Sequence, residues 1–298
     1  MVIVMEVKQL NLEALEQERQ KVYRKNRNMY ILSGILILLG IGITFLFFGG
    51  FILLVIAFVL IFVASSDVKK FKKIFKDSVV KKLISEELGV HAFYQRDRGI
   101  DMDEINSLRL GSRPDRYQME DYISCTYNDV FYEMCDCVLE EKVVTRDSHG
   151  HRQVSYQKYF KGRIIKIDFK RDIHKELKVV NQPMRGFQAG DLVKFETEVT
   201  EFNKKFKCYA SSKEDGFYLL TPYMIQKMLE LEKMYVGGIY YAVMHDNLYI
   251  LINNNGDSLE VNISKPLDHK QLERIRADIL IGASIINEFR MDSDKFNA

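Results

Sequence analysis

The pattern of hydrophobic and polar positions is dominated by one uncharged apolar block, which runs from Tyr30 to Ala64. A single helix of about 35 residues would be ~50 Å long, whereas the hydrocarbon core of a bilayer is only ~30 Å thick. Gly49 and Gly50 interrupt the block and allow the reversed backbone of a tight turn. The block therefore predicts a transmembrane helical hairpin over residues 29–66, with spans at 30–48 and 51–66.

Basic residues flank the block on both sides. Because such residues stay on the cytoplasmic side of a membrane, both termini are expected to be cytoplasmic. A single tilted span and a re-entrant hairpin stay open, since the second apolar segment is short. A secretory signal peptide is disfavoured by the polar stretch of about 28 residues that comes first. The flanking residues are Lys21, Arg24, Lys25 and Arg27 before the block, and Lys69, Lys70, Lys72, Lys73 and Lys76 after it.

Helical periodicity continues on both sides of the block. Residues 1–28 predict a charged helix that runs into the first span, and residues 67–90 predict a basic amphipathic helix. We expect its lysines, Lys69, Lys70, Lys72, Lys73 and Lys76, to contact anionic lipid headgroups at the membrane surface. The other interpretation is that these lysines only set the topology while the apolar face packs on the soluble domain.

Alternating patterns of period two begin near Met119 and predict β-strands. The alternation at 123–127, the turn residues Asn128 and Asp129, and the apolar run 130–139 predict a hairpin in which Cys125 lies opposite Tyr132. A second turn at 147–150 and strands at 154–160 and 165–169 extend it to an antiparallel meander.

The last third mixes helices and strands. Strands are expected at 192–199 and 206–209, and a hairpin at 239–252. Thr221 and Pro222 are typical of a helix start, and Asp268 with Gln271 resembles a capping box ahead of a closing helix. The predicted class is α+β: the membrane hairpin, then a soluble domain at 91–298 with an antiparallel sheet and two or three packed helices. Its β-rich part spans 91–190 and its mixed part 191–298.

Charge and cysteine content place the soluble domain inside the cell. Residues 1–90 contain 13 basic and 8 acidic residues, so the remainder has 30 and 33 and is slightly acidic. That balance argues against a nucleic-acid partner. The chain has only four cysteines, too few for a disulfide-stapled secreted scaffold, and they are expected to be reduced thiols.

Candidate metal ligands are few. Cys135 and Cys137 lie two apart and face one side of a strand, away from Cys125, but two thiols do not make a structural zinc site. His149 and His151 with Asp147 could bind zinc or nickel, although an exposed turn explains them as well. We therefore expect no metal and no cofactor.

The segment 201–206 is the candidate binding surface, because aromatic and basic residues alternate in it. Phe202, Lys204 and Lys205 could stack on a ligand and pair with an anion; the other interpretation is that Phe202 and Phe206 are core anchors beside a turn. The chain lacks a phosphate loop, a nucleophile elbow and a dinucleotide fingerprint, and no catalytic residue is assigned.

Several short motifs resemble a domain-of-unknown-function family of bacterial membrane proteins, in which a pair of apolar spans precedes a cytoplasmic domain. The resemblance covers roughly residues 20–250 and implies a bacterial inner-membrane protein, with no activity to transfer. The motifs are Phe160-Lys161-Gly162-Arg163, Asp168-Phe169-Lys170, Glu201-Phe202-Asn203-Lys204-Lys205-Phe206 with Tyr209, and Tyr218-Leu219-Leu220-Thr221-Pro222 ahead of Met224.

The sequence thus favours a membrane-anchored binding or scaffold module of unknown ligand over an enzyme. Expected partners are the membrane itself, anionic lipid headgroups, and a protein or a second copy of the chain. The alternative is an enzyme of an unfamiliar class that acts on a lipid headgroup or small anion. These hypotheses differ in one feature, since the enzyme requires a concave pocket lined by titratable groups.

Overall fold

The computed structural model describes residues 12–44, 49–146, 150–170 and 173–293. It divides into two compact units. Unit 1 contains residues 1–83 and 259–277, and unit 2 contains residues 84–258 and 278–298. The sequence alone did not separate residues 259–277, here named the return segment, from the rest of the soluble domain.

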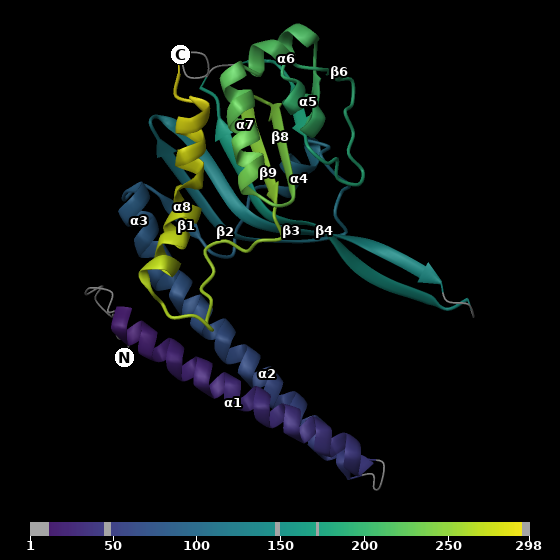
Figure 1. Cartoon of the computed structure of the whole chain (residues 1–298), viewed down its shortest axis with the longest axis vertical. Helices are drawn as coiled ribbons and strands as arrows, with labels where there is room; N and C mark the ends of the chain where they lie inside the picture. Colours follow the sequence, from purple (N-terminus) through teal and green to yellow (C-terminus); the bar gives the residue numbers. More distant parts are fainter. Residues whose placement is uncertain (1–11, 45–48, 147–149, 171–172, 294–298) are drawn as a thin grey trace. The chain divides into compact units, whose positions relative to one another are not determined.

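Unit 1 is built on two long antiparallel helices (Figure 1). They are α1 (Leu12–Thr44) and α2 (Gly50–Phe75), and α2 continues through a π-helical turn, η1 (Lys76–Val80), into α3 (Lys81–Leu88). From Leu12 onward the charged N-terminal helix runs without a break into the first apolar segment, and residues 1–11 of the predicted helix lie outside the described residues. Both α1 and the run 50–88 are long and apolar enough to cross a membrane by length and composition.

Small residues line the seam between α1 and α2. The buried positions of α1 recur every seventh residue and end at Ser33 and Gly40, while those of α2 begin at Gly50 and Ala57 with the same spacing. A Cβ atom on Gly50 would lie 2.4 Å from the Gly40 carbonyl oxygen. Small seam residues allow helix backbones to approach closely, and a seven-residue repeat keeps the seam facing the partner helix.

The outer faces of these helices expose large apolar side chains. Leu38 is 74% exposed, Phe58 71% and Phe62 70%. Contiguous exposure of this kind is costly in water and natural in a bilayer. The hairpin is therefore compatible with a membrane anchor.

Unit 2 contains one nine-stranded antiparallel sheet in the order β1-β2-β3-β4-β9-β8-β5-β7-β6. The predicted α+β class is confirmed. The strands are β1 (Phe93–Gln95), β2 (Arg116–Tyr127), β3 (Val130–Arg146), β4 (Arg152–Asp168), β5 (Leu177–Val180), β6 (Val193–Phe195), β7 (Lys207–Ala210), β8 (Gly238–Met244) and β9 (Asn247–Asn253). The helices are α4 (Met102–Ser107), α5 (Thr200–Lys205), α6 (Lys213–Leu219), α7 (Pro222–Met234) and α8 (His269–Phe289). Only the part of α8 from Asp278 onward belongs to unit 2, and its first residues belong to unit 1.

Two predicted local signals lie where the sequence placed them, whereas the predicted turn at 147–150 falls largely outside the described residues. Asn128 and Asp129 both adopt positive φ in the tight turn between β2 and β3, and Cys125 pairs with Tyr132 as expected. The Thr221 hydroxyl caps α7 by accepting the Met224 amide. Two expectations were wrong in detail. The predicted strands 154–160 and 165–169 belong to the single strand β4, in which Gly162 lies so near the Ile252 carbonyl oxygen that a Cβ would clash with it. The predicted strand 192–199 is shorter, since only Val193–Phe195 pairs as β6.

The central part of the sheet is buried on both faces. On one face Met102 and Ile105 of α4 pack with Tyr122, Cys135 and other strand residues. On the opposite face a Cβ on Gly282 of α8 would touch the Tyr132 ring, and Phe289 lies 6.2 Å from Tyr241 between ring centroids. Such double coverage explains why β3, β4, β8 and β9 contain long runs of buried residues.

Candidate functional site at the polar end of the helical hairpin

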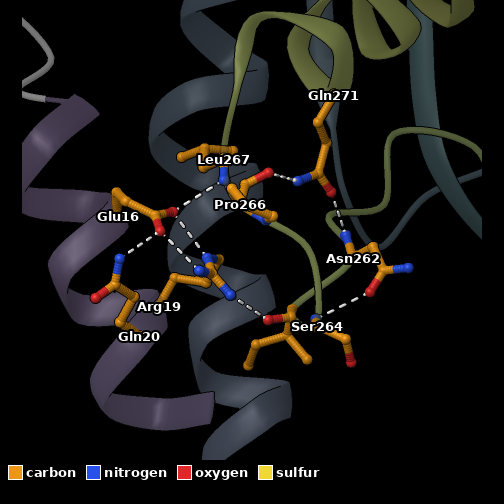
Figure 2. A network of polar contacts seen from close by, with 9 residues as sticks. Glu16, Arg19, Gln20, Asn262, Ser264, Pro266, Leu267 and Gln271 are labelled. Carbon is orange, nitrogen blue, oxygen red and sulfur yellow. Dashed lines mark hydrogen bonds and ion pairs between the residues drawn. The ribbon is translucent and has the colours of Figure 1, made fainter. Parts of the chain in front are cut away.

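The return segment is bound to the polar end of α1 by a compact network (Figure 2). The Glu16 carboxylate accepts hydrogen bonds from Arg19 at 2.6 and 2.7 Å, from Gln20 at 2.8 Å and from the Leu267 amide at 2.9 Å. The Arg19 guanidinium also donates to the Ile263 carbonyl oxygen at 2.5 Å. Each charge therefore has both a counter-charge and a backbone partner.

The same segment supplies a counter-charge to α2. Both oxygens of Glu260 are used, with Lys72 Nζ at 2.5 Å from one and Lys76 Nζ at 2.6 Å from the other. Burial opposes ionisation of Glu260, but the two ammonium groups outweigh it and lower its pKa. Lys76 belongs to the π-helical turn, and its side chain is only 4% exposed. A buried lysine is stable only when it is paired, so this contact fixes the return segment on the helix.

A groove of about 320 Å³ lies between α1 and α2 in unit 1. Lys25 and Asp67 form an ion pair across it at 2.7 Å. Its lining combines charged and apolar side chains: Glu18, Lys21, Val22, Lys25, Asp67, Lys70, Phe71 and Ile74. Three lysines face two carboxylates there, so the groove carries a net positive charge.

The five lysines predicted to contact lipid fall into two groups. Lys72 and Lys76 are bound to Glu260, whereas Lys69, Lys70 and Lys73 are exposed. The apolar face of this helix also packs inside the protein, because Phe71 and Phe75 of α2 are buried. Lipid contact by the exposed lysines stays a prediction.

The structure buries one of the three residues predicted to form a binding surface at 201–206 and leaves the other two at least partly exposed. Phe202 is fully buried and stacks on Phe206 at 4.7 Å between centroids, as expected if both rings are core anchors. Lys205 pairs with Glu232 at 2.5 Å, and Lys204 is exposed. Phe202 therefore supports α5 from inside, and a ligand contact by Lys204 and Lys205 stays a prediction.

The cysteines lie in the core. Cys135 and Cys137 share the α4 face of the sheet, as their spacing predicted, and burial raises the pKa of Cys135 to about 12. All four thiols are free and buried. Two members of the proposed histidine site, Asp147 and His149, lie outside the described residues.

A row of titratable side chains crosses the α4 face of the sheet. Lys166 of β4 lies 2.9 Å from Glu104 of α4 and 3.5 Å from Glu133 of β3. The Tyr122 and Tyr249 hydroxyls donate to Glu133 and Glu104, each at 2.5 Å. Burial pulls the pKa of Lys166 down, but Glu104 and Glu133 outweigh it and the pKa is raised. These groups satisfy one another, so the row joins α4 to the sheet.

An acidic cluster lies on the opposite face. Carboxylate oxygens of Asp121, Asp136 and Asp257 are within 4.8 Å of one another, a set that could hold a divalent cation by residue type. However, Arg163 donates to Asp136 at 2.9 Å and the Tyr94 hydroxyl to Asp121 at 2.7 Å. A buried guanidinium repels a cation, so these residues fit an ion-paired core better than a metal centre.

The Glu16 contact predicts an acid-sensitive return segment. Arg19, with Gln20 and the Leu267 amide, lowers the pKa of Glu16 from 4.5 to about 2. The ionised Glu16 carboxylate therefore contributes its full stabilisation of the return segment above pH 4.5. This stabilisation is lost as the pH falls toward 2 and the carboxylate becomes protonated. Hydrogen exchange of residues 263–268, corrected for intrinsic rates, should show declining protection over this range. In Glu16→Gln, protection should be lower from the start and its decline with acid smaller, because Glu260, whose pKa is also lowered by Lys72 and Lys76, still titrates there. An equal acid-induced decline in both proteins would contradict the assignment.

Comparison with known proteins gives a family of unknown function. A family model described as "Protein of unknown function (DUF3137)" matches residues 158–291, from within β4 to just beyond α8. The matched region includes all the motifs on which the resemblance rested, so a domain-of-unknown-function family is supported, although the match does not extend to residues 20–157. Comparisons with curated proteins and with solved structures found no match.

Sequence reasoning missed the residues that hold the return segment. Glu16 and Glu260 are 244 positions apart in the chain, and no local pattern relates them. For Lys76 the helical periodicity points the other way, because a regular helix directs position 76 away from the face of Phe71 and Phe75, yet the Lys76 side chain is buried in the π-helical turn.

Proposed function

We propose that the chain is a membrane-anchored binding or scaffold module at the inner membrane of a bacterium, with both termini in the cytoplasm. The observation that supports this most strongly is the hairpin. Its seam is closed by small residues, its outer faces are apolar, and its open end is rich in lysine and arginine. Such an anchor concentrates the attached sheet domain at the membrane surface, where a partner can be recruited.

Cysteine accessibility in intact cells tests the anchor and its topology. Gly49 is exposed and its Cβ position is open, so Gly49→Cys reports the hairpin turn, and Lys204→Cys reports the sheet domain. A membrane-impermeant maleimide should label Gly49→Cys from outside, but Lys204→Cys only after lysis. The four native cysteines are buried and give a low background. Labelling of Lys204→Cys in intact cells would refute the topology, and a turn labelled from neither side would indicate a re-entrant hairpin.

Site-specific photo-crosslinking tests the binding role. A crosslinker at Lys204, on the predicted surface, is compared with one at Val144, which is 43% exposed on the distal part of β3. The binding hypothesis expects one protein to be crosslinked reproducibly from position 204 in native membranes and not from 144.

The enzyme alternative has one feature in its favour. Asp168 lies on the same strand as Lys166, and burial raises its pKa. A small anion that co-purifies with the full chain, and is lost in Lys166→Met while crosslinking finds no protein, would favour this alternative.

A further inference from the structure

The groove between α1 and α2 lies at the depth expected for lipid headgroups. The apolar block begins at Tyr30 and ends at Ala64. Asp67 and Lys25 are within about 8 Å of these boundaries along their helices, and Lys21 and Lys70 within about 14 Å, at 1.5 Å per residue. The polar region of a leaflet is of order 5–8 Å thick, and a lysine side chain extends several ångströms further.

The lining of the groove has two chemical parts. Lys21 and Lys70 are exposed ammonium donors on opposite helices, while Phe71, Ile74 and Val22 form an apolar wall. Ile74 is 56% exposed, so the wall is open at the surface. A free phosphate would use only the first part, whereas a phospholipid would place its phosphate on the lysines and its glycerol and upper acyl carbons on the wall.

The remaining charges leave these two lysines available. Lys25 is held by Asp67 at 2.7 Å, and Lys72 and Lys76 are held by Glu260. Lys21 has only a long contact of 3.7 Å with Glu18, which is itself 56% exposed. Lys70 is exposed and lies near Asp67, whose pKa it helps to lower, but it forms no direct ion pair among the residues that the structure describes. An anion entering the groove therefore gains two cations without breaking a short ion pair.

We propose that this groove is a binding site for one anionic phospholipid, whose phosphate is held by Lys21 and Lys70. The inference rests on the proposed membrane anchor and sharpens it: lipid recognition belongs to the seam between the helices rather than to the lysine-rich face of α2 and η1. Basic pockets between membrane helices on the cytoplasmic side are known to take such headgroups.

The test compares two variants of the full chain that lose the same charge. Lys21→Gln/Lys70→Gln empties the groove, and Lys69→Gln/Lys73→Gln removes two exposed lysines that do not line it. Each protein is reconstituted in nanodiscs containing phosphatidylcholine and phosphatidylglycerol in equal amounts. Native mass spectrometry after release then measures the phosphatidylglycerol and phosphatidylcholine retained per chain.

The unmodified chain and the control variant are expected to retain one phosphatidylglycerol in preference to phosphatidylcholine. The groove variant should lose about fivefold in this preference for each lysine removed. Equal losses in the two variants, or no preference in the unmodified chain, would overturn the proposal. Failure of the unmodified chain to insert into bilayers at all would instead refute the membrane anchor, so the two hypotheses fail by different results.

Discussion

Arg163→Met is expected to destabilise the sheet domain by about 3–5 kcal/mol, because it leaves a carboxylate buried without its counter-charge. Arg163 and Asp136 are paired across β4 and β3, with side chains only 4% and 6% exposed. The guanidinium also donates to the Asp278 carbonyl oxygen of α8, so the substitution removes a contact to that helix as well. Hydrogen exchange of the β3 and β4 amides in the detergent-solubilised full chain measures the effect.

Arg185→Met is the matched control. Arg185 also forms an ion pair, with Glu141 at 2.7 Å, but its side chain is 73% exposed. Exposed pairs of this kind contribute about 0–1 kcal/mol, so exchange from β3 and β4 should be almost unchanged. The double variant Arg163→Met/Asp136→Leu should recover part of the loss, because the carboxylate that Arg163 pairs with directly is then removed together with it. Equal effects of Arg163→Met and Arg185→Met would show that the buried pair has no special role.

Local sequence signals predicted the parts of the fold that depend on neighbouring residues. Asn128-Asp129 fixed a two-residue turn and with it the register of β2 and β3, and Thr221-Pro222 located the start of α7. Asp268 caps α8 by accepting the Gln271 amide at 2.9 Å, but the Gln271 side chain binds Asn262 instead of closing a capping box. Short elements such as α4 and β5 were missed, because six and four residues give too little periodicity.

The candidate site could be predicted only in part. Lysine clusters next to an apolar block correctly indicate a basic end of the hairpin, yet they do not tell which lysines pair within the chain. The sequence pattern predicted the same role, contact with lipid headgroups, for Lys70, Lys72 and Lys76, because their spacing along the helix is similar. What separates them is the distant Glu260, and a contact over such a sequence separation leaves no local pattern.

Buried polar residues also explain how the helix pair acquires one register. Asn26 is buried in the seam, seven positions from both Arg19 and Ser33. A polar residue at such a position disfavours shifted pairings, in which it would face apolar side chains. The contacts at the polar end act in the same direction, because the return segment binds α1 through Glu16 and Arg19 and α2 through Glu260, and so links the two helices.

Glu260→Gln should therefore release the return segment from the helices. The glutamine keeps the size of the side chain but removes the charge that balances Lys72 and Lys76, and Lys76 is almost completely buried. Breaking a buried ion pair costs about 3–5 kcal/mol, which corresponds to a rise of at least about 100-fold in local opening. Hydrogen exchange of residues 259–268 in the full chain measures that opening directly.

The control for this experiment is Glu18→Gln, which removes one carboxylate from the same unit. Glu18 is 56% exposed and lies 3.7 Å from Lys21, so its loss should leave exchange of residues 259–268 nearly unchanged. Adding Lys76→Met to Glu260→Gln should restore part of the protection, because a methionine needs no counter-charge at a buried position. If Glu260→Gln and Glu18→Gln exchange alike, the segment is held by its buried apolar residues, Leu259, Val261 and Leu267, rather than by charge.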